Sequence, residues 1–281
     1  MGILNGLRPG RACLAGAPMF VAHRGGSRLA PENTMEAFRS AVEDWGVDML
    51  ETDAHLTRDG EVVLIHDATV DRTCDGAGPV RDMSLAEVQR LDAGYHFRDL
   101  DGRHSFRGEG VRVPSLAEVL EAFPRVRINV ETKTREVAVP LVDLVRVHGA
   151  EQRVLVAAEY DRDRQPVRGY AGPWGTSRRQ VMSFWVAVQT GTWRAYTPAG
   201  DVLQVPESWR GIRVVSPRFI RAAHARNIPV QVWTVDEEAD MRRLLEWGVD
   251  GIQTDRPDVL ARVLMDVAGR PAPPIWTSAD P

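Results

Sequence analysis

The sequence predicts an α/β fold, specifically a (β/α)8 TIM barrel with a small insertion subdomain after the second strand. Short runs typical of strands alternate with helix-like runs, which indicates a parallel sheet with crossover helices. About eight such strands are expected, each followed by a helix or an excursion. The length of 281 residues lies in the range in which α/β barrels form one domain.

The elements before the insertion begin with a strand and a helix. The expected order is strand 19–25, helix 32–46, strand 49–56 and strand 61–67. Asn33 or Thr34 would cap the helix, which Gly46 would end. Arg58-Asp59-Gly60 is a turn signal, so the last two strands are expected to form a hairpin.

Residues 69–112 interrupt this alternation with several glycines and one short helical stretch at 84–91, and we interpret them as the insertion. The elements expected after it are helix 115–122, strand 127–133, helix 136–148, strand 154–160 and helix 177–189. Residues 161–176 have no clear pattern. The last third predicts strands 202–206, 213–216, 230–235 and 251–255, with helices 217–227, 237–247 and 256–266.

The domain organisation predicted from this pattern is an N-terminal extension, a barrel and a Pro-rich tail. Their ranges are 1–18, 19–266 and 267–281. The N-terminus lacks the apolar core of a signal peptide, and no 18-residue apolar run occurs, so we expect a cytoplasmic protein without a transmembrane segment. A net charge of −4 provides no general electrostatic footprint for nucleic acid. The oligomeric state stays open.

The segment "MLETDAHL" places two carboxylates on one face of a strand. Alternation puts Glu51, Asp53 and His55 on one side, and Leu50 and Ala54 on the other. Carboxylates in a fold interior require a cation, a shared proton or basic partners. The alternative is an edge strand whose carboxylates face water.

Reactive side chains also occur at the ends of other expected strands, where (β/α)8 barrels have their active sites. Together they are His23, Arg24, Glu51, Asp53, His66, Glu131 and Lys133. Carboxylate oxygens suit Mg²⁺ or Ca²⁺ better than zinc. The lysine and arginine would stabilise a phosphoryl group, and the two histidines would divide proton transfer. This set predicts cleavage of a phosphate ester.

Seven strings in order resemble the glycerophosphodiester phosphodiesterase family, which has a phosphatidylinositol-phosphodiesterase-like barrel with an insertion after the second strand. They are "VAHRGGSRLAPENTMEAF", "LETDAHLTRDGEVVLIHD", "TVDRTCDGAGPV", "VPSLAEVL", "INVETK", "VQVWTV" and "GVDGIQTDRP". The resemblance implies a divalent cation on Glu51, Asp53 and Glu131, an acid/base pair His23 and His66, and phosphate contacts from Arg24 and Lys133. It also implies attack by the substrate's glycerol 2-hydroxyl and release of glycerol 3-phosphate and an alcohol.

Two further residues are candidates for the substrate pocket. Trp233 could line it or belong to the core. Glu159 stands in "VAAEY", where the family commonly has a Ser-Phe pair, and a carboxylate there would favour a cationic headgroup. The run over 203–224 is similar to members that act on lysophospholipids, so a lysophospholipase D-type reaction is an alternative.

Two functions of other classes are also compatible with such a barrel. A metal-dependent sugar isomerase or lyase would use Glu and Asp ligands with His and Lys, but the cations beside the metal are better explained by a phosphate. A non-catalytic binding module would be supported by the loss of a reactive residue, and none is lost.

Overall fold

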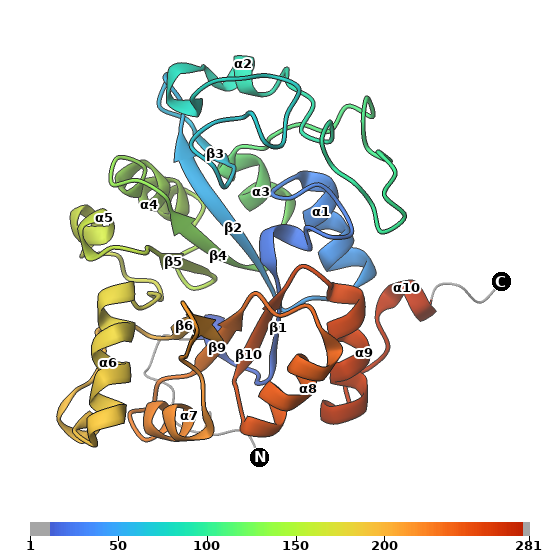
Figure 1. The fold of residues 1–281 in the computed structure, drawn as a ribbon. Coiled ribbons are helices and arrows are strands. Elements are labelled where there is room, and N and C mark those ends of the chain that lie inside the picture. Colours follow the sequence, from blue (N-terminus) through green and yellow to red (C-terminus); the bar gives the residue numbers. More distant parts are fainter. Residues whose placement is uncertain (1–11, 278–281) are drawn as a thin grey trace.

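The chain forms a parallel β-barrel surrounded by helices, in agreement with the predicted (β/α)8 fold (Figure 1). The computed structural model describes residues 12–277. Seven parallel strands are hydrogen-bonded in the order β5 (Val154–Ala157), β4 (Arg127–Thr132), β2 (Met49–Leu56), β1 (Met19–Ala22), β10 (Gly251–Thr254), β9 (Val230–Trp233) and β6 (Leu203–Pro206). The expected N-terminal extension up to residue 11 and the tail from residue 278 lie outside the described residues.

Residues 173–176 occupy the remaining strand position, between β5 and β6. The Gly175 amide donates to the Val156 carbonyl, and the Thr176 amide donates to the Val202 carbonyl, each with an N···O distance of 3.0 Å. These bridges connect the two edge strands. The sequence showed no pattern here because Pro173 and Gly175 are of residue types depleted in strands; the neighbours on both sides impose the extended backbone.

The strand predicted over 213–216 is wrong. Its first residue belongs to β8 (Ile212–Arg213), which pairs with β7 (Ser208–Trp209) in a separate antiparallel hairpin after β6. Val215 is fully buried and packs in the hydrophobic core. The valines therefore serve packing rather than sheet formation, which hydrophobic pattern alone does not distinguish.

The helices cover the outer face of the barrel (Figure 1). They are α1 (Met35–Arg39), α3 (Leu116–Ala122), α4 (Ala138–Val147), α5 (Asp161–Arg164), α6 (Arg178–Thr190), α7 (Pro217–His224), α8 (Glu238–Trp247) and α9 (Pro257–Ala268); the short α10 (Pro274–Thr277) lies outside this layer and packs on the helical turn at 40–44. The Thr34 side chain accepts from the Ala37 amide and caps α1, so Asn33 is not its cap. Within residues 12–277, no helix has the length and apolar character needed to cross a bilayer.

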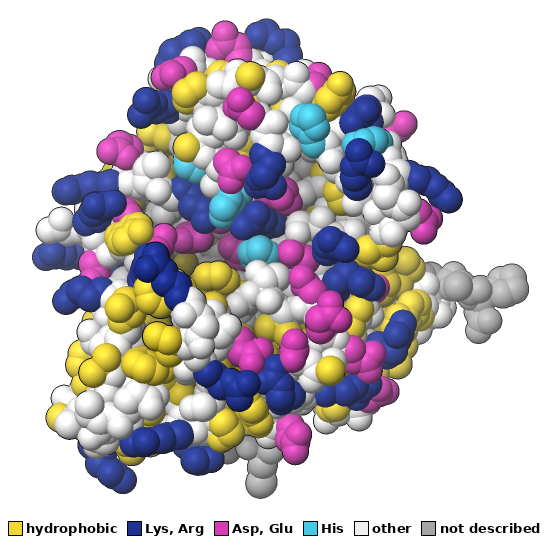
Figure 2. Space-filling view, in the orientation of Figure 1, with side chains coloured by type: hydrophobic (Ala, Val, Ile, Leu, Met, Phe, Trp, Pro, Cys, Tyr) yellow, Lys and Arg dark blue, Asp and Glu magenta, His cyan; other side chains and the backbone are white. Residues whose placement is uncertain are grey.

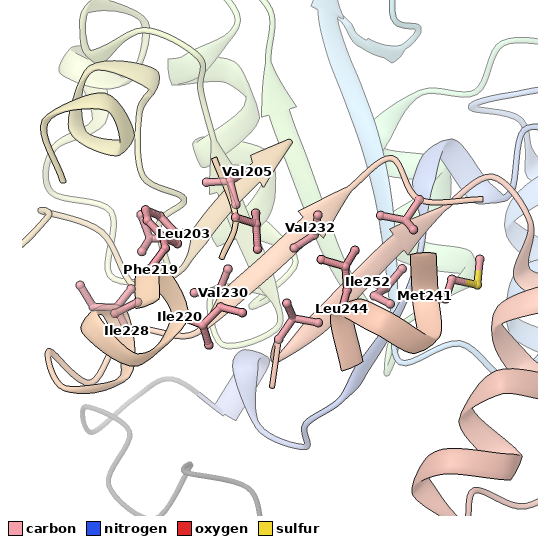
Figure 3. Packing of buried hydrophobic residues seen from close by; sticks show 14 of the residues in the cluster. Leu203, Val205, Phe219, Ile220, Ile228, Val230, Val232, Met241, Leu244 and Ile252 are labelled. Carbon is pink, nitrogen blue, oxygen red and sulfur yellow. The ribbon is translucent and has the colours of Figure 1, made fainter. Parts of the chain in front are cut away.

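Apolar layers lie on both sides of the strands. Leu203 and Val230 point outward and pack with Phe219 of α7 and Leu244 of α8 (Figure 3). Inside the barrel, a smaller apolar cluster includes Met19, Val21, Met49, Leu155 and Val202. Because side chains alternate along β2, Glu51 and Asp53 continue the inward row that Met49 begins. The closed end of the barrel is therefore apolar and the open end is charged.

The segment between β2 and α3 forms a subdomain above the barrel mouth (Figure 1). It starts with β3 (Val62–Leu64), which pairs antiparallel with β2, and contains α2 (Leu85–Val88), which is shorter than the helix predicted over 84–91. Its buried residues form a cluster of their own: Val63, Ile65, Val70, Cys74, Val80, Val88, Ala93, Val111 and Val113. This core fixes the segment that follows β3 relative to the mouth.

Candidate active site

The strand register places His23 between two carboxylates. β1 ends at Ala22 with β2 on one side and β10 on the other, so His23 lies between Glu51 of β2 and Asp255, the residue after β10. His23 Nδ1 donates to Asp255 Oδ1 over 2.7 Å. Because Asp255 holds Nδ1, the free Nε2 is turned toward the cluster and lies 3.8 Å from Glu51 Oε2.

Three carboxylates form a cluster at the open end of β2 and β4. Asp53 and Glu131 are direct register partners, and Glu51 precedes Asp53 on the same face. One oxygen from each lies within 4.8 Å of the others. Glu51 and Asp53 are buried, whereas Glu131 is partly exposed. The predicted acidic wall thus lies in the barrel interior, which excludes the alternative of a solvated edge strand.

Two cationic side chains balance this negative charge. Lys133 Nζ lies 2.8 Å from both Asp53 Oδ1 and Glu131 Oε2. The Arg24 amide donates to Glu51 Oε2 over 3.0 Å, and its guanidinium Nε is 3.3 Å from Asp53 Oδ2. Lys133 and Arg24 therefore border the carboxylates, as their positions at strand ends predicted.

The pKa values of Glu51 and Asp53 shift in opposite directions because the two carboxylates have different neighbours. Burial, together with repulsion from Asp53, raises the pKa of Glu51 to about 7. Burial would also raise the pKa of Asp53, but Lys133 and Arg24 outweigh it and lower that pKa. Burial would lower the pKa of His23, yet Glu51 and Asp255 raise it above its usual value. Glu51 therefore binds a proton more readily than an ordinary carboxyl group, and Asp53 binds one less readily.

His66 is held at the mouth by a chain of ion pairs that sequence reasoning missed. His66 Nδ1 donates to Asp67 Oδ1 over 2.6 Å, and Arg72 of the insertion donates to Asp67 Oδ2 over 2.6 Å. Arg72 also binds both carboxylate oxygens of Glu32, at 2.7 and 2.8 Å. Glu32 in turn accepts from Arg24 over 3.1 Å. The insertion thus connects His66 with Arg24.

Histidine, acidic and basic side chains gather in the middle of the face shown in Figure 2, below the insertion. Each candidate catalytic histidine has its own aspartate, Asp255 for His23 and Asp67 for His66. Hydrogen bonds from Arg72 and His66 outweigh the opposing effect of burial and lower the pKa of Asp67 to about 2. Burial would raise the pKa of Asp255, but its hydrogen bond and ion pair with His23 outweigh burial and lower it. Each aspartate therefore accepts from Nδ1 of its histidine and fixes the tautomer of that ring.

Asn33 is a further site residue that the sequence did not reveal. Its Nδ2 donates to Asp53 Oδ2 over 3.1 Å, and its Oδ1 accepts from Thr52 Oγ1 over 2.6 Å. The residue is buried with a φ of 56°. Asparagine adopts this left-handed conformation more readily than most residues. The side chain of Asn33 orients Asp53, and the adjacent Thr34 caps the helix. Asp255 could have been found as a carboxylate at the end of a barrel strand.

Trp233 and Glu159 have different surroundings from the other predicted site residues. Trp233 is the last residue of β9 and lies on the same inward face of that strand as Gln231. It is 41% exposed at the barrel mouth. Glu159 follows β5, and its Oε1 accepts from Arg178 Nη1 over 2.9 Å. Within the described residues, Glu159 has no hydrogen bond or ion pair to any of the seven site residues predicted at strand ends, which are His23, Arg24, Glu51, Asp53, His66, Glu131 and Lys133. Its charge is already balanced by Arg178.

The residues present fit a divalent cation. Three carboxylate oxygens converge, and hard oxygen donors of this type bind Mg²⁺ or Ca²⁺. Lys133 already places a positive charge on two of the three groups. Asn129 lies next to Glu51 in register, and its buried Oδ1 has no hydrogen-bond partner among the described residues. An unsatisfied buried oxygen at this level is consistent with a water or ion site.

Comparisons with known proteins agree on one family. The model of the Glycerophosphoryl diester phosphodiesterase family matches residues 23–165 and 175–259. A probable glycerophosphodiester phosphodiesterase 2 of Mycobacterium tuberculosis is 34% identical over 260 residues, which cover 89% of this chain and 92% of that protein. A glycerophosphodiester phosphodiesterase of Caldanaerobacter subterraneus is 31% identical over 267 residues, covering 88% of this chain and 97% of the relative.

Solved structures show the same fold. A glycerophosphodiester phosphodiesterase from Agrobacterium tumefaciens superposes with a TM-score of 0.66 at 28% identity, over 86% of this chain and 98% of that one. A glycerophosphoryl diester phosphodiesterase domain from Mycobacterium tuberculosis has a TM-score of 0.78 at 21% identity, over 89% and 100% of the two chains. The second similarity concerns the fold alone.

Proposed function

This chain belongs to the glycerophosphoryl diester phosphodiesterase family, and from that premise we propose that it hydrolyses glycerophosphodiesters at the mouth of its barrel with a divalent cation. One observation supports the proposal most: the cluster of three carboxylates lies at the barrel mouth together with two histidines, each of which is hydrogen-bonded to an aspartate. Membership of this enzyme family favours an enzyme over a non-catalytic binding module and gives no support to a sugar isomerase or lyase.

The cation would be held by Glu51, Asp53 and Glu131. When bound, Mg²⁺ or Ca²⁺ supplies positive charge that polarises a phosphoryl oxygen. Binding it to these carboxylates would also free Lys133, whose ammonium otherwise contacts two of them. Lys133 and Arg24 would then contact the non-bridging oxygens of the phosphodiester, where negative charge grows during displacement.

His23 and His66 would divide the proton transfers. Each has Nδ1 bound to an aspartate, which leaves Nε2 for the substrate. One imidazole accepts the proton of the glycerol 2-hydroxyl as this oxygen attacks phosphorus, and the other donates a proton to the departing alcohol oxygen. Water then opens the cyclic phosphate, and the protons return. The products are an alcohol and glycerol 3-phosphate, and the enzyme is regenerated.

Lysophospholipids are the second candidate substrate class, because they share the glycerophosphodiester group and add an acyl chain. Exposed apolar side chains beside the mouth favour this extension. For the headgroup, the carboxylate of Glu159 would favour choline or ethanolamine over inositol once its pair with Arg178 opens. Glu159→Gln with these three esters tests that preference, and unchanged ratios would contradict it.

The decisive experiment measures glycerol 3-phosphate released from glycerophosphocholine by the purified protein. We expect EDTA to abolish release, Mg²⁺ or Ca²⁺ to restore it, and His23→Ala to abolish it with either metal. His96→Ala, which changes an exposed histidine of the insertion, is the matched control and should retain activity. Metal-independent release would contradict the metal site, and full activity of His23→Ala would contradict the proton-transfer assignment.

A further inference from the structure

Exposed apolar side chains gather on one side of the barrel mouth. We define the apolar rim as Tyr160, Met182, Val186, Trp209 and Ile212, each at least 36% exposed. Tyr160 follows β5 and the β7–β8 hairpin follows β6, and parallel strands end at the same side of a sheet. Figure 2 shows hydrophobic side chains over α6 on the same face as the histidines. The apolar rim and the candidate catalytic histidines therefore lie on the same face of the molecule.

The rim is continuous in space. Tyr160, Met182 and Val186 line a shallow groove along α6. Arg178, at the start of α6, lines the same groove and stacks over the Trp209 ring at 4.8 Å. The apolar groove thus continues onto the β7–β8 hairpin.

Arginines surround the rim and outnumber its carboxylates. The arginines are Arg162, Arg178, Arg179, Arg210 and Arg213, and the carboxylates beside them are the exposed Glu159 and the partly buried Asp161 and Glu207. Arg178 pairs with Glu159 at 2.9 Å, Arg179 with Asp161 at 2.7 Å and Arg243 with Glu207 at 2.8 Å. Arg210 and Arg213 have no ion pair with any described carboxylate, and Arg210 stacks on Trp209 at 4.7 Å. The rim is therefore positive on a chain whose net charge is −4.

We propose that the apolar rim docks on the surface of an anionic phospholipid bilayer. Aromatic rings and arginines are the side chains that settle at a membrane interface, because an apolar body enters the acyl boundary while the charged group stays at the headgroups. Basic side chains add attraction to anionic lipids. Docking would bring the barrel mouth to the headgroup layer, where lysophospholipids are presented. The substrate part of this inference rests on the proposed function.

The charge pattern favours a bilayer over a second copy of the chain. In a two-fold dimer the same patch meets itself, which would place two arginine-rich surfaces opposite each other. Like charges at such a contact oppose association. A bilayer with anionic headgroups complements the same arginines.

The test is cosedimentation of the protein with vesicles of phosphatidylcholine alone or with 30% phosphatidylglycerol. We expect the wild type to bind the anionic vesicles, and the double variant Trp209→Ser, Ile212→Ser to bind at least tenfold more weakly. Arg210→Glu should weaken binding and reduce its salt dependence. The matched control is Leu100→Ser with Val147→Ser, which removes exposed apolar side chains outside the rim and should leave binding unchanged.

Two measurements separate this inference from the proposed function. His23→Ala should bind the vesicles like the wild type even if hydrolysis is lost. The rim double variant should keep the wild-type melting temperature and its activity on soluble glycerophosphocholine. The inference is overturned if the wild type does not bind anionic vesicles, if the Leu100 and Val147 control loses binding equally, or if the rim instead mediates a dimer that the double variant abolishes.

Discussion

Replacing Glu51 by Gln should stabilise the metal-free protein at high pH. Glu51 is buried beside Asp53, and its pKa rises from the ordinary 4.5 to about 7. Below pH 4.5 the carboxyl is protonated in both the folded and unfolded states and does not affect stability. Between these two pKa values the folded state binds more protons, so stability falls as pH rises. Glutamine keeps an oxygen that accepts from the Arg24 amide and never ionises.

The size of the effect follows from the two pKa values. Each pH unit between the two pKa values lowers the free energy of unfolding by about 1.4 kcal/mol. Above pH 7 the ionised carboxylate therefore destabilises the folded protein by about 3 kcal/mol. For a chain of this size we expect the melting temperature of Glu51→Gln to exceed that of the wild type by about 5 to 10 °C.

The assay is thermal unfolding in EDTA at pH 5 and pH 8. The gap between Glu51→Gln and wild type should be small at pH 5 and reach its full size at pH 8. Glu109→Gln, at an exposed position, should show no such gap. Mg²⁺ or Ca²⁺ at pH 8 should stabilise the wild type more than Glu51→Gln. An equal gap at both pH values, or one below about 1 kcal/mol at pH 8, would refute the reasoning.

Three further changes test other parts of the structure. Asp255→Asn removes the carboxylate that holds the His23 ring and raises its pKa, so kcat should fall about 10- to 100-fold and the acidic limb of the pH profile should move to lower pH. Arg72→Lys breaks the two-oxygen contact with Glu32 and should lower kcat about tenfold, whereas Arg81→Lys, exposed in the same insertion, should not. Phe184→Ala empties a fully buried position and should lower the free energy of unfolding, measured in urea, by about 3 to 5 kcal/mol without changing metal binding.

The sequence predicted the barrel because most of its elements carry strong local signals. The strand over 49–56 coincides with β2, since its alternation and turn signal act together. The strand position at 173–176 could not be found, because its extended backbone is imposed by β5 and β6 rather than by its own residues. Where local preference and tertiary context disagree, the context decides.

The same limit applies to the site. Glu51, Asp53 and Glu131 are recognisable because strand alternation places them together at one end of the barrel. The pairings that orient His23 and Glu32 depend on contacts between segments far apart in the chain, so spacing does not reveal them, even though Asp255 itself is recognisable as a carboxylate at the end of a strand. Asp255 reaches His23 across 232 positions of sequence, and Arg72 reaches Glu32 across 40.

The insertion has an evolutionary consequence that follows from its two parts. We call the part that contains His66, Asp67 and Arg72 its root. Ion pairs connect this part to the barrel, so changes there would alter catalysis. Its tip, about 95–110, is largely exposed and contributes no buried residue to the core of the insertion. Homologous enzymes can therefore exchange or lengthen the tip as a module while they keep the root, and recombination within this family should find its most permissive boundaries there.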